Sequence, residues 1–339
     1  MDYKLEILFN NDNDDILYEG ISYIKKNLSD TLKVTENSII LSFSRSKTFR
    51  ISELFNTPSS LVRYGIQRAL CFYLSIVGNI PDVKSIHFIN PKNKIGIEHS
   101  ELTRDWQNCN IDICLPKEVC SIIFTSHKKA KAVYIALTYF LKAQLACFSN
   151  DCFRAAWSGL NSIYNWYKNN DGDSERKLID QFADILKDMQ LCNTISFLKG
   201  FDYKIWHKIE WHNFINSQLG KKVTQLLSPN KYPDFIVLSQ LLFYYKKENF
   251  DILDAEKQVK NIIKNKELNY KVQLKFLLCE YCYFQRNRYF HAGKAYPLFV
   301  LSNDHETKME NVLTKVLLLT IKDFLTEEFQ QISSKKEFI

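Results

Sequence analysis

"HKKAKAVYIALTYFLKAQLACF", residues 127–148, is the stretch where the character of the sequence changes. Its apolar side chains recur every three or four residues, which places them on one face of a helix. They are Val133, Leu137, Phe140, Leu141 and Leu145. Helical spacing continues from here almost to the C-terminus, whereas the preceding part mixes short alternating runs with helical ones. The sequence therefore predicts an α+β domain over residues 1–122, followed by an all-helical domain over residues 123–339.

Within the first domain, strands are expected wherever short runs rich in β-branched residues occur. These runs are 5–9, 38–43, 83–89, 94–99 and 110–115. Residues 14–28 and 59–77 have helical spacing, and the second segment opens with serine and closes near Gly78. No catalytic constellation stands out here, so we expect this domain to sense a trigger or to bind a partner or substrate.

The second domain contains a succession of amphipathic segments. The expected helices are 127–148, 150–170, 174–190, 203–219, 234–247, 252–265, 269–290 and 306–330. Asn150 or Asp151 is a suitable N-cap for the second of them. Its apolar stripe consists of Phe153, Trp157, Leu160 and Tyr164. Pro229 and Pro233 bracket the clearest internal loop.

Composition places the 339-residue chain among globular proteins, since hydrophobic residues make up 46% and charged residues 24%. Only nine glycines and seven prolines interrupt it, which favours long helices. There is no leader-like N-terminus, and no apolar run approaches the roughly 20 residues that cross a bilayer. We expect a cytoplasmic protein without a membrane partner. The net charge of +7 permits a polyanionic partner.

The nine cysteines are expected to be reduced thiols, and several of them lie within apolar helical patterns. Cys109, Cys114, Cys120 and His127 could be imagined as zinc ligands, but their spacing is irregular and contains no close pair. The Cys-x-x-Cys pair at 279–282 lies in a helical pattern without a second pair, which favours packing. We therefore expect no metal and no cofactor.

"RNRYFHAG", residues 286–293, concentrates cationic and hydrogen-bonding side chains after the apolar run 272–284. Arg286 carries a permanent charge on a planar fork that suits a phosphate. His291 can exchange a proton near neutral pH, and Asn287 adds a donor and an acceptor. Cleavage of RNA without a metal needs a base, a cation beside the phosphate and an acid.

Helix geometry limits how this motif can work. Five residues of a straight helix turn through about 500°, so Arg286 and His291 would lie about 140° apart. They would meet at one phosphate only if the helix breaks between them or a second subunit contributes. A non-catalytic explanation stays open, because basic residues followed by Gly293 are also typical of an ordinary helix C-terminus.

The motif Arg286-Asn287-x-x-x-His291-Ala292-Gly293 resembles the signature of the HEPN superfamily, whose members often carry Arg-Asn-x-x-x-His-Gly near the end of a long helix. Trp157, Leu160 and Ile163 are similar to that family's Trp-x-x-Leu-Glu-x-Leu helix, and residues 307–325 are similar to its amphipathic final helix. The resemblance covers residues 126–330. It implies an all-helical bundle, usually dimeric, and a metal-independent RNA endonuclease.

The resemblance also implies roles for residues. Arg286 would bind and polarise the phosphate, His291 would serve as acid or base, and Asn287 would position one of them. Arg288 could add affinity for the phosphate or be an exposed salt-bridge partner, and Lys294 would be a peripheral contact to the substrate. Asn161 is a further substrate-binding candidate, although it stands where many relatives have Glu.

Two aromatic residues and one glycine complete the interpretation of the motif. Tyr289 and Phe290 could stack on bases or pack in the core. Gly293 stands where the subclass paired with a nucleotidyltransferase antitoxin has tyrosine, which disfavours regulation by tyrosine modification.

The first hypothesis is accordingly an RNA-cleaving homodimer with a composite active site, in a bacterial stress or anti-phage role, with a possible antitoxin or trigger protein as partner. The alternative is a catalytically inactive HEPN module that binds a nucleotide or a protein. Residues 207–212 lack the histidine spacing of a zinc protease. Short basic clusters at 128–131 and 221–222 are either solvated surface or part of an RNA path.

Overall fold

The computed structural model describes residues 1–25, 28–46, 49–52, 60–98, 109–167, 172–200, 209, 214, 270–290 and 305–334. The chain divides into two compact units. Unit 1 consists of residues Met1–Leu145 and Glu328–Ile339, and unit 2 consists of Ala146–Glu327. An N-terminal antiparallel sheet is thus followed by helices, as the sequence predicts. The compact units divide the chain at residue 145 and again at 327, whereas the predicted boundary lies at residue 122.

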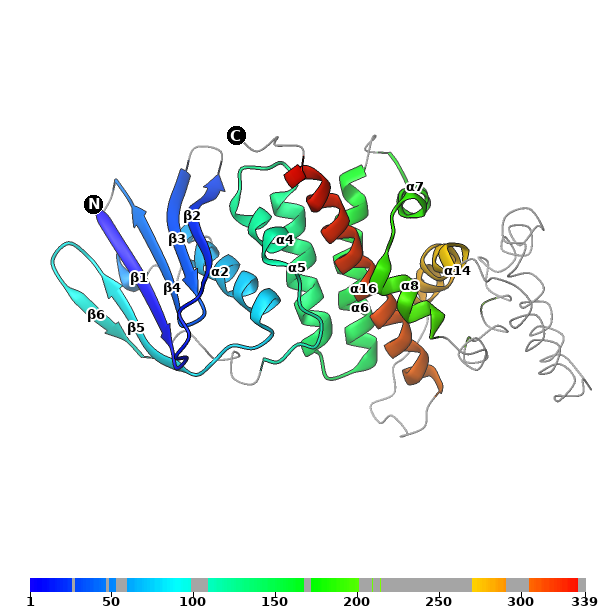
Figure 1. The fold of residues 1–339 in the computed structure, drawn as a ribbon, viewed down its shortest axis with the longest axis horizontal. Helices are drawn as coiled ribbons and strands as arrows, with labels where there is room; N and C mark the ends of the chain where they lie inside the picture. The colour runs from blue at the N-terminus through cyan, green and yellow to red at the C-terminus, as the bar shows by residue number, and fades with distance from the viewer. Residues whose placement is uncertain are drawn as a thin grey trace, which may run out of the picture. The chain divides into compact units, whose positions relative to one another are not determined.

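Unit 1 is built on a six-stranded antiparallel sheet with the order β2-β3-β4-β1-β5-β6 (Figure 1). The strands are β1 (Asp2–Phe9), β2 (Ile16–Lys25), β3 (Leu28–Thr35), β4 (Ser38–Ser44), β5 (Val83–Ile89) and β6 (Lys94–Ile97). The predicted strands at 5–9, 38–43, 83–89 and 94–99 are confirmed as β1, β4, β5 and β6.

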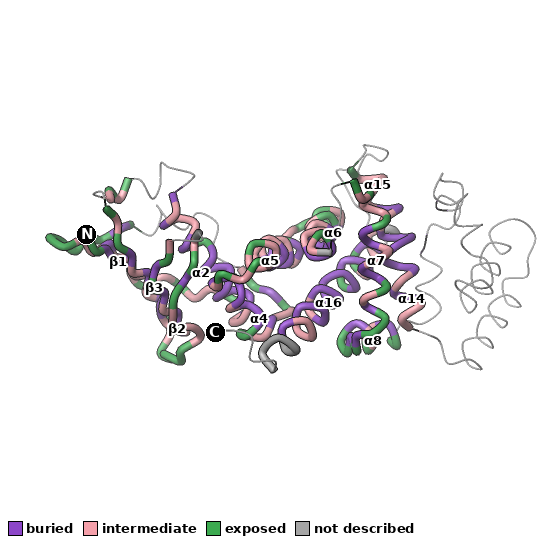
Figure 2. The backbone as a smooth tube through the Cα atoms, turned by 90° about the horizontal axis from the view of Figure 1, so that it is seen from above, coloured by how far each residue is buried: buried purple, intermediate pink, exposed green. Residues whose placement is uncertain are grey.

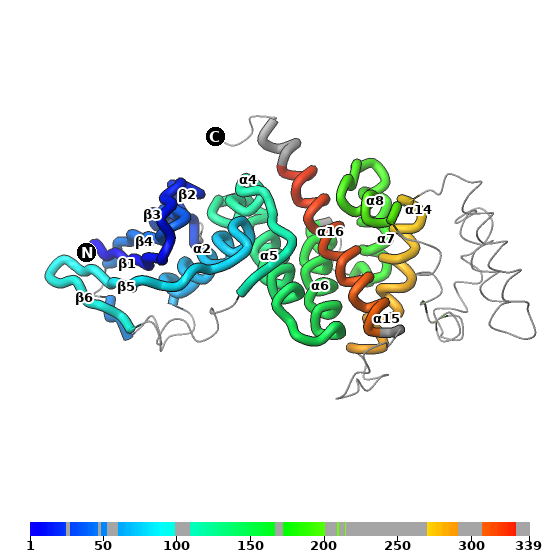
Figure 3. Tube along the Cα trace, turned by 60° about the horizontal axis from the view of Figure 1, so that its bottom comes forward, coloured from blue at the N-terminus to red at the C-terminus, as the bar shows by residue number. Residues whose placement is uncertain are grey.

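One face of this sheet carries the core. Residues that lie opposite each other across the central strands are fully buried, as in the pairs Leu5 with Leu41 and Ile7 with Ile39. The other face carries charged side chains such as Glu6, which pairs with Lys4 at 2.5 Å. This alternation is typical of an antiparallel sheet with one covered face. Helix α2 (Leu61–Val77) lies beside the sheet in two views (Figures 1 and 3).

Helix α2 begins and ends where the sequence predicts. The side chain of Ser60 accepts a hydrogen bond from the backbone N–H of Arg63, and Gly78 closes the helix in the left-handed conformation at φ 88°. A Cβ on Gly65 would lie 3.2 Å from a methyl carbon of Leu41. Helix and sheet therefore approach each other closely at this glycine.

The prediction of a helix at 14–28 is wrong. Within this segment, residues 16–25 form β2 and Leu28 begins β3. Strand β2 is an edge strand, and Ile16 and Ile21 are each 52% exposed. Because the strand buries few side chains, the alternation that reveals a half-buried strand is missing, and pairing with β3 decides its conformation.

The prediction of a strand at 110–115 is also wrong. Within this segment Ile111 donates its backbone N–H to the carbonyl of Gly78, and Ile113 exchanges hydrogen bonds with the side-chain amide of Gln144. The backbone groups are thus satisfied by a helix end and a side chain rather than by a neighbouring strand. The segment leads into α4 (Lys117–Ser121), the 3-10 turn η1 (Ile122–Phe124) and α5 (Ala130–Leu145).

The described elements of unit 2 are helical. They are α6 (Ser149–Tyr164), η2 (Asn165–Tyr167), α7 (Glu175–Asp188), α8 (Cys192–Lys199), α14 (Tyr270–Phe276), the π-helical segment η3 (Leu277–Cys282), α15 (Tyr283–Phe290) and α16 (His305–Ser334), whose last residues belong to unit 1. The predicted stripe of α6 is buried, and α16 is buried along most of its described length (Figure 2). Helix α6 begins at Ser149 without a side-chain cap, contrary to the prediction for Asn150 or Asp151.

Helix α8, which the sequence did not predict, is capped by carboxylates of α16. Asp323 accepts hydrogen bonds from the backbone N–H and the hydroxyl of Thr194, both at 2.7 Å. Glu327 accepts from the backbone N–H groups of Gln190 and Leu191. Leu191 adopts a left-handed conformation at φ 54°, which turns the chain into the helix. The predicted helices at 203–219, 234–247 and 252–265, and the loop at 229–233, lie outside the described residues.

Candidate functional site

The motif residues 286–288 lie on α15, which directly follows the π-helical segment η3. All six residues of η3 are buried, including Glu280 at 1% exposure. A charged residue in the core needs a partner, and Arg176 of α7 supplies it. Its Nη2 atom lies 2.5 Å from the carboxylate of Glu280, and its Nη1 atom donates to the carbonyl of Cys279. This contact fixes the irregular segment from which α15 continues.

Arg286 is held by contacts on both of its terminal nitrogens. Its Nη2 atom forms an ion pair with Glu175 at 2.8 Å, and its Nη1 atom donates to the side-chain oxygen of Asn287 at 2.7 Å. The guanidinium also lies 5.1 Å from the ring centre of Phe290 and 5.9 Å from that of Tyr283. Arg286 is therefore oriented by a carboxylate, an amide and two rings.

Glu175 joins three helices at one carboxylate. Besides the ion pair with Arg286, it accepts a hydrogen bond from the hydroxyl of Tyr164 at 2.7 Å and one from the amide of Asn161 at 3.5 Å. Burial, together with the negative charge of Glu175, raises the pKa of Tyr164, so its hydroxyl remains a donor. We call this set, Asn161, Tyr164, Glu175, Arg286 and Asn287, the Glu175 network.

The Glu175 network brings together the two sequence motifs that were singled out separately. Asn161 lies on α6 and Arg286 with Asn287 on α15, more than 100 residues further along the chain. Sequence reasoning missed Glu175, the residue that connects them. It occupies the first turn of α7 after the cap Ser174, where an acidic residue is ordinary because it complements the helix dipole. No signal in the sequence distinguished it.

A second arginine that sequence reasoning missed lies next to the network. The guanidinium of Arg154 on α6 lies 5.3 Å from the ring centre of Phe290. The guanidinium of Arg286 lies near the same ring. Phe290 is 42% exposed. An exposed ring in contact with two guanidinium groups combines stacking surface with cationic side chains, as sites for single-stranded nucleic acid do. Each guanidinium also has a carboxylate neighbour, Asp151 for Arg154 and Glu175 for Arg286.

The remaining motif residues have different surroundings. Arg288 donates to Gln285 at 3.3 Å and lies over the ring of Phe284, within its own helix. Tyr289 packs against Phe153 with a ring-centre distance of 6.0 Å. His291, Gly293 and Lys294 lie outside the described residues, as do the candidates at 207–208, 210–212 and 221–222. Helix α15 is described up to Phe290, the residue before His291.

The cysteines differ in burial, and the structure describes buried, half-buried and exposed thiols. Cys279 and Cys282 are buried in η3, and burial raises the pKa of both thiols, which agrees with a packing role. Cys120 is buried as well. Among the described residues, no group of three or more His, Cys, Asp or Glu side chains is arranged to hold a metal ion. Nor is any described helix both long and apolar enough for a membrane span.

Comparisons of this chain with protein-family models, with curated proteins and with solved structures find no match. The function must therefore be argued from the site itself.

Proposed function

We propose that this protein is a metal-independent endoribonuclease with a HEPN-like helical domain, and that the Glu175 network forms one half of its active site. The proposal is supported by one observation above all: Asn161 and Arg286, which the resemblance selects from two separate motifs, contact the same carboxylate of Glu175, and Asn287 accepts a hydrogen bond from Arg286. An arginine held in this way presents a fixed cation to a phosphate, which lowers the cost of ordering it during the reaction.

The proposed reaction is the attack of a ribose 2′-oxygen on the adjacent phosphorus. A base removes the 2′-hydroxyl proton, the bond from phosphorus to the 5′-oxygen breaks, and an acid protonates that leaving oxygen. The products are a 2′,3′-cyclic phosphate and a 5′-hydroxyl. Arg286 stabilises the charge on the phosphate oxygens, Asn287 orients Arg286, and His291 transfers a proton. Arg288 and Lys294 add electrostatic affinity for RNA, and the step needs no cofactor.

The direct test uses purified full-length protein and RNA in the presence of EDTA. Cleavage with 2′,3′-cyclic phosphate ends is expected, and Arg286→Ala and His291→Ala should each lower the rate at least about a hundredfold. Lys187→Ala is the matched control, because Lys187 is an exposed cation on α7, 54% accessible, that faces Asp184. Equal cleavage by wild type and both variants would exclude this site.

The proposed homodimer with a shared site has its own test. Arg286→Ala and His291→Ala proteins, each inactive alone, are mixed after brief unfolding and refolded together. If one protomer supplies the arginine and the other the histidine, mixed dimers regain part of the activity. A monomer by analytical ultracentrifugation, or mixtures as inactive as the separate variants, would remove the shared site while leaving a nuclease confined to one chain.

A second function is favoured by the ion pair itself. Glu175 neutralises Arg286 within one chain, which suits a non-catalytic module that binds a nucleotide or a protein partner. Wild-type protein that leaves RNA intact but binds a nucleotide, with affinity lost in Arg286→Ala, would support this function.

The proposed nuclease carries with it a proposed biological role in bacterial stress or anti-phage defence. The protein would act in the cytoplasm, and an antitoxin or trigger protein would control it. This role rests on the proposed nuclease activity.

A further inference from the structure

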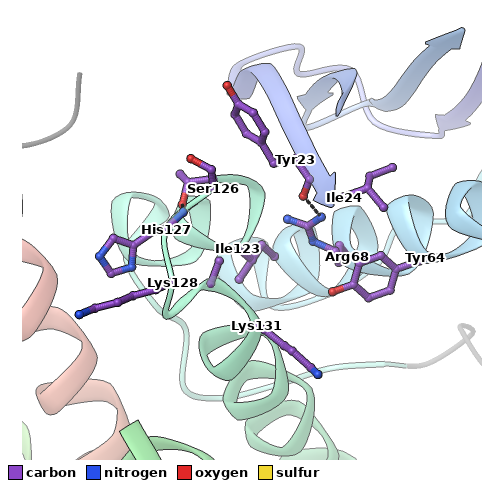
Figure 4. A pocket seen from close by; sticks show the side chains of 11 residues that line it. Tyr23, Ile24, Tyr64, Arg68, Ile123, Ser126, His127, Lys128 and Lys131 are labelled. Carbon is purple, nitrogen blue, oxygen red and sulfur yellow. Dashed lines mark hydrogen bonds between the residues drawn. The ribbon is translucent and has the colours of Figure 1, made fainter. Parts of the chain in front are cut away.

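A pocket of about 270 Å³ lies within unit 1, remote in sequence from the Glu175 network. Its wall is formed by the end of β2, the middle of α2 and the segment that connects η1 to α5 (Figure 4). No aspartate or glutamate lines it, whereas Arg68, His127, Lys128 and Lys131 do. The pocket is therefore basic. The most buried of its basic residues is Arg68.

Arg68 is only 2% exposed. Its Nη1 atom donates to the backbone carbonyl of Tyr23 at 2.7 Å, and its guanidinium lies 5.3 Å from the ring centre of Tyr64 and 5.4 Å from that of Phe124. No carboxylate in the described part of the chain pairs with it, and its buried Nε atom has no hydrogen-bond partner. Burial lowers the pKa of this guanidinium, with partial compensation from Tyr64 and neighbouring tyrosines.

A buried cation without a counter-ion is costly, since desolvation of an ion is offset only by a partner of opposite charge. Two aromatic faces and one carbonyl stabilise Arg68 only in part. The unused donors are informative, because Nη1 is taken by Tyr23 while Nε lacks a partner. Nε and Nη2 form the edge of a guanidinium that binds two oxygens of one phosphate or carboxylate.

The rim of the pocket adds further positive potential. Lys128 and Lys131 are exposed, and neither forms an ion pair within the part of the chain that the structure describes. The lysine between them behaves differently, since Lys129 pairs with Glu328 at 2.5 Å. Helix α5 begins at Ala130, so the positive end of its dipole lies at the pocket. Figure 4 shows Arg68 between the end of β2 and the segment that carries Ile123 and Ser126.

We propose that this pocket binds the phosphate group of a small phosphate ester, with Arg68 as the buried anchor and Lys128 and Lys131 as contacts at the rim. Its volume lies just below the range of about 300–1,000 Å³ that is usual for drug-sized ligands, which suits a single nucleotide or a smaller ester. Tyr23 and Tyr64 give the wall an aromatic surface for the organic part. The site uses none of the proposed nuclease residues and does not depend on the proposed function.

The test is calorimetric titration of the full-length protein with inorganic phosphate and, separately, with adenosine 5′-monophosphate. Binding of either probe is expected. Arg68→Met should weaken it about tenfold or more, because two charge-assisted hydrogen bonds are lost. Lys128→Ala combined with Lys131→Ala should weaken binding severalfold and leave the folding stability of the protein unchanged. Tighter binding of the nucleotide than of phosphate would assign the organic part to the tyrosine wall, and equal binding would limit recognition to the phosphate group.

Lys142→Ala is the matched control, since Lys142 is an exposed lysine near the other end of α5 and lies over Tyr139. It should bind both probes as the wild type does. If Arg68→Met fails to fold, the rim double variant decides alone. Three results would overturn the proposal: no binding of either probe at millimolar concentration, binding that the rim double variant leaves unchanged, or binding that Lys142→Ala weakens as much as the rim double variant does.

Discussion

The carboxylate of Glu175 accepts hydrogen bonds from Asn161 and Tyr164 and pairs with Arg286. This one side chain therefore helps to position side chains of two other helices. An exposed ion pair contributes little to stability, because water screens the charges and the side chains lose entropy. The pair of Glu175 with Arg286 differs, since the two side chains are only 22% and 18% exposed and Tyr164 donates to the same carboxylate. Removal of one partner here leaves the other charge partly buried.

Glu175→Gln keeps the size of the side chain and removes its charge. We expect the free energy of unfolding to fall by about 1–3 kcal/mol, the usual cost of losing a hydrogen-bonded charge partner. Urea unfolding measures the loss, and a cycle with Arg286→Gln isolates the coupling between the two residues. Glu19→Gln is the control, because Glu19 is 56% exposed and lies 3.9 Å from Lys33. A loss no greater than that of Glu19→Gln would contradict the argument.

Tyr164 gives the network a dependence on alkaline pH. Burial and the charge of Glu175 raise the pKa of its hydroxyl above the ordinary value of 10.0, so above that pH the unfolded chain releases a proton that the folded chain retains. The contribution of this hydroxyl to the free energy of unfolding is fully present below pH 10. It falls by about 1.4 kcal/mol for each pH unit above pH 10.

Tyr164→Phe should therefore lose stability less steeply than the wild type above pH 10, with parallel curves below it. Tyr73 and Tyr134, whose pKa values are raised to about 12, contribute equally to both proteins and cancel in the difference. Urea unfolding at a series of pH values measures the two slopes. Identical slopes would mean that the hydroxyl of Tyr164 titrates normally in the folded protein.

Among single residues, the sequence predicts candidate site residues that belong to short motifs, but it does not predict the residues from other helices that contact them. Arg286 and Asn287 were identified because their types and spacing match a chemical need, and Asn161 because of its place in a second motif. Glu175 and Arg154 had no such pattern around them. Arg68 lies in an amphipathic helix where an arginine usually faces solvent, and only the tertiary fold buries it.

Single elements differ in how well local sequence determines them. Helix α2 was predictable from Ser60 to Gly78 because caps and apolar spacing agree. Strand β2 and the segment 110–115 were not, since one is an exposed edge and the other bonds to a helix end and to Gln144. Helix α8 is short, and its N-terminus is capped by Asp323 and Glu327 from the distant α16, so its own sequence carries little of the signal.

The C-terminus of α2 allows a prediction about one such local determinant. Gly78→Ala puts a Cβ on a residue with φ 88°, where it would lie 3.1 Å from the sulfur of Cys114 and 3.4 Å from the carbonyl oxygen of Ile111. We expect a loss of at least about 1–2 kcal/mol in unfolding free energy, from the left-handed backbone alone. Gly96→Ala is the matched control, because no atom lies within 4 Å of its added Cβ. Equal effects of both substitutions in thermal unfolding would refute the argument.

The whole molecule divides differently from its sequence pattern, for a physical reason. Residue 122 marks a change of secondary structure, but the helix that follows packs on the first unit. Tyr134 of α5 contacts Tyr64 of α2 with a ring-centre distance of 5.4 Å, and Gln144 bonds the backbone of Ile113. A change of pattern locates a new kind of element, whereas a unit is defined by what that element packs against.

Unit 1 also includes the C-terminal residues Glu328–Ile339. Glu328 pairs with Lys129, and the ring of Phe329, which is 5% exposed, lies against His127. A chain that ends at Glu327 loses both contacts. Burial of a phenylalanine side chain contributes about 1.5–3 kcal/mol, so unit 1 should open at least about tenfold more often. The buried thiols report this for each unit by itself, since Cys71 and Cys120 belong to unit 1 and Cys279 and Cys282 to unit 2.

Burial raises the pKa of all four thiols, that of Cys71 to about 12, so an alkylating reagent at pH 8 modifies them only after opening. In the shortened chain, mass spectrometry should find faster labelling of Cys71 and Cys120 than in the wild type, with the unit 2 thiols unchanged. The exposed Cys147 and Cys192 serve as internal standards for the reagent. Phe329→Ala in the full chain should accelerate the same two thiols by a smaller factor. Faster labelling in unit 2 alone, or equally in both units, would show that residues 328–339 do not stabilise unit 1 in particular.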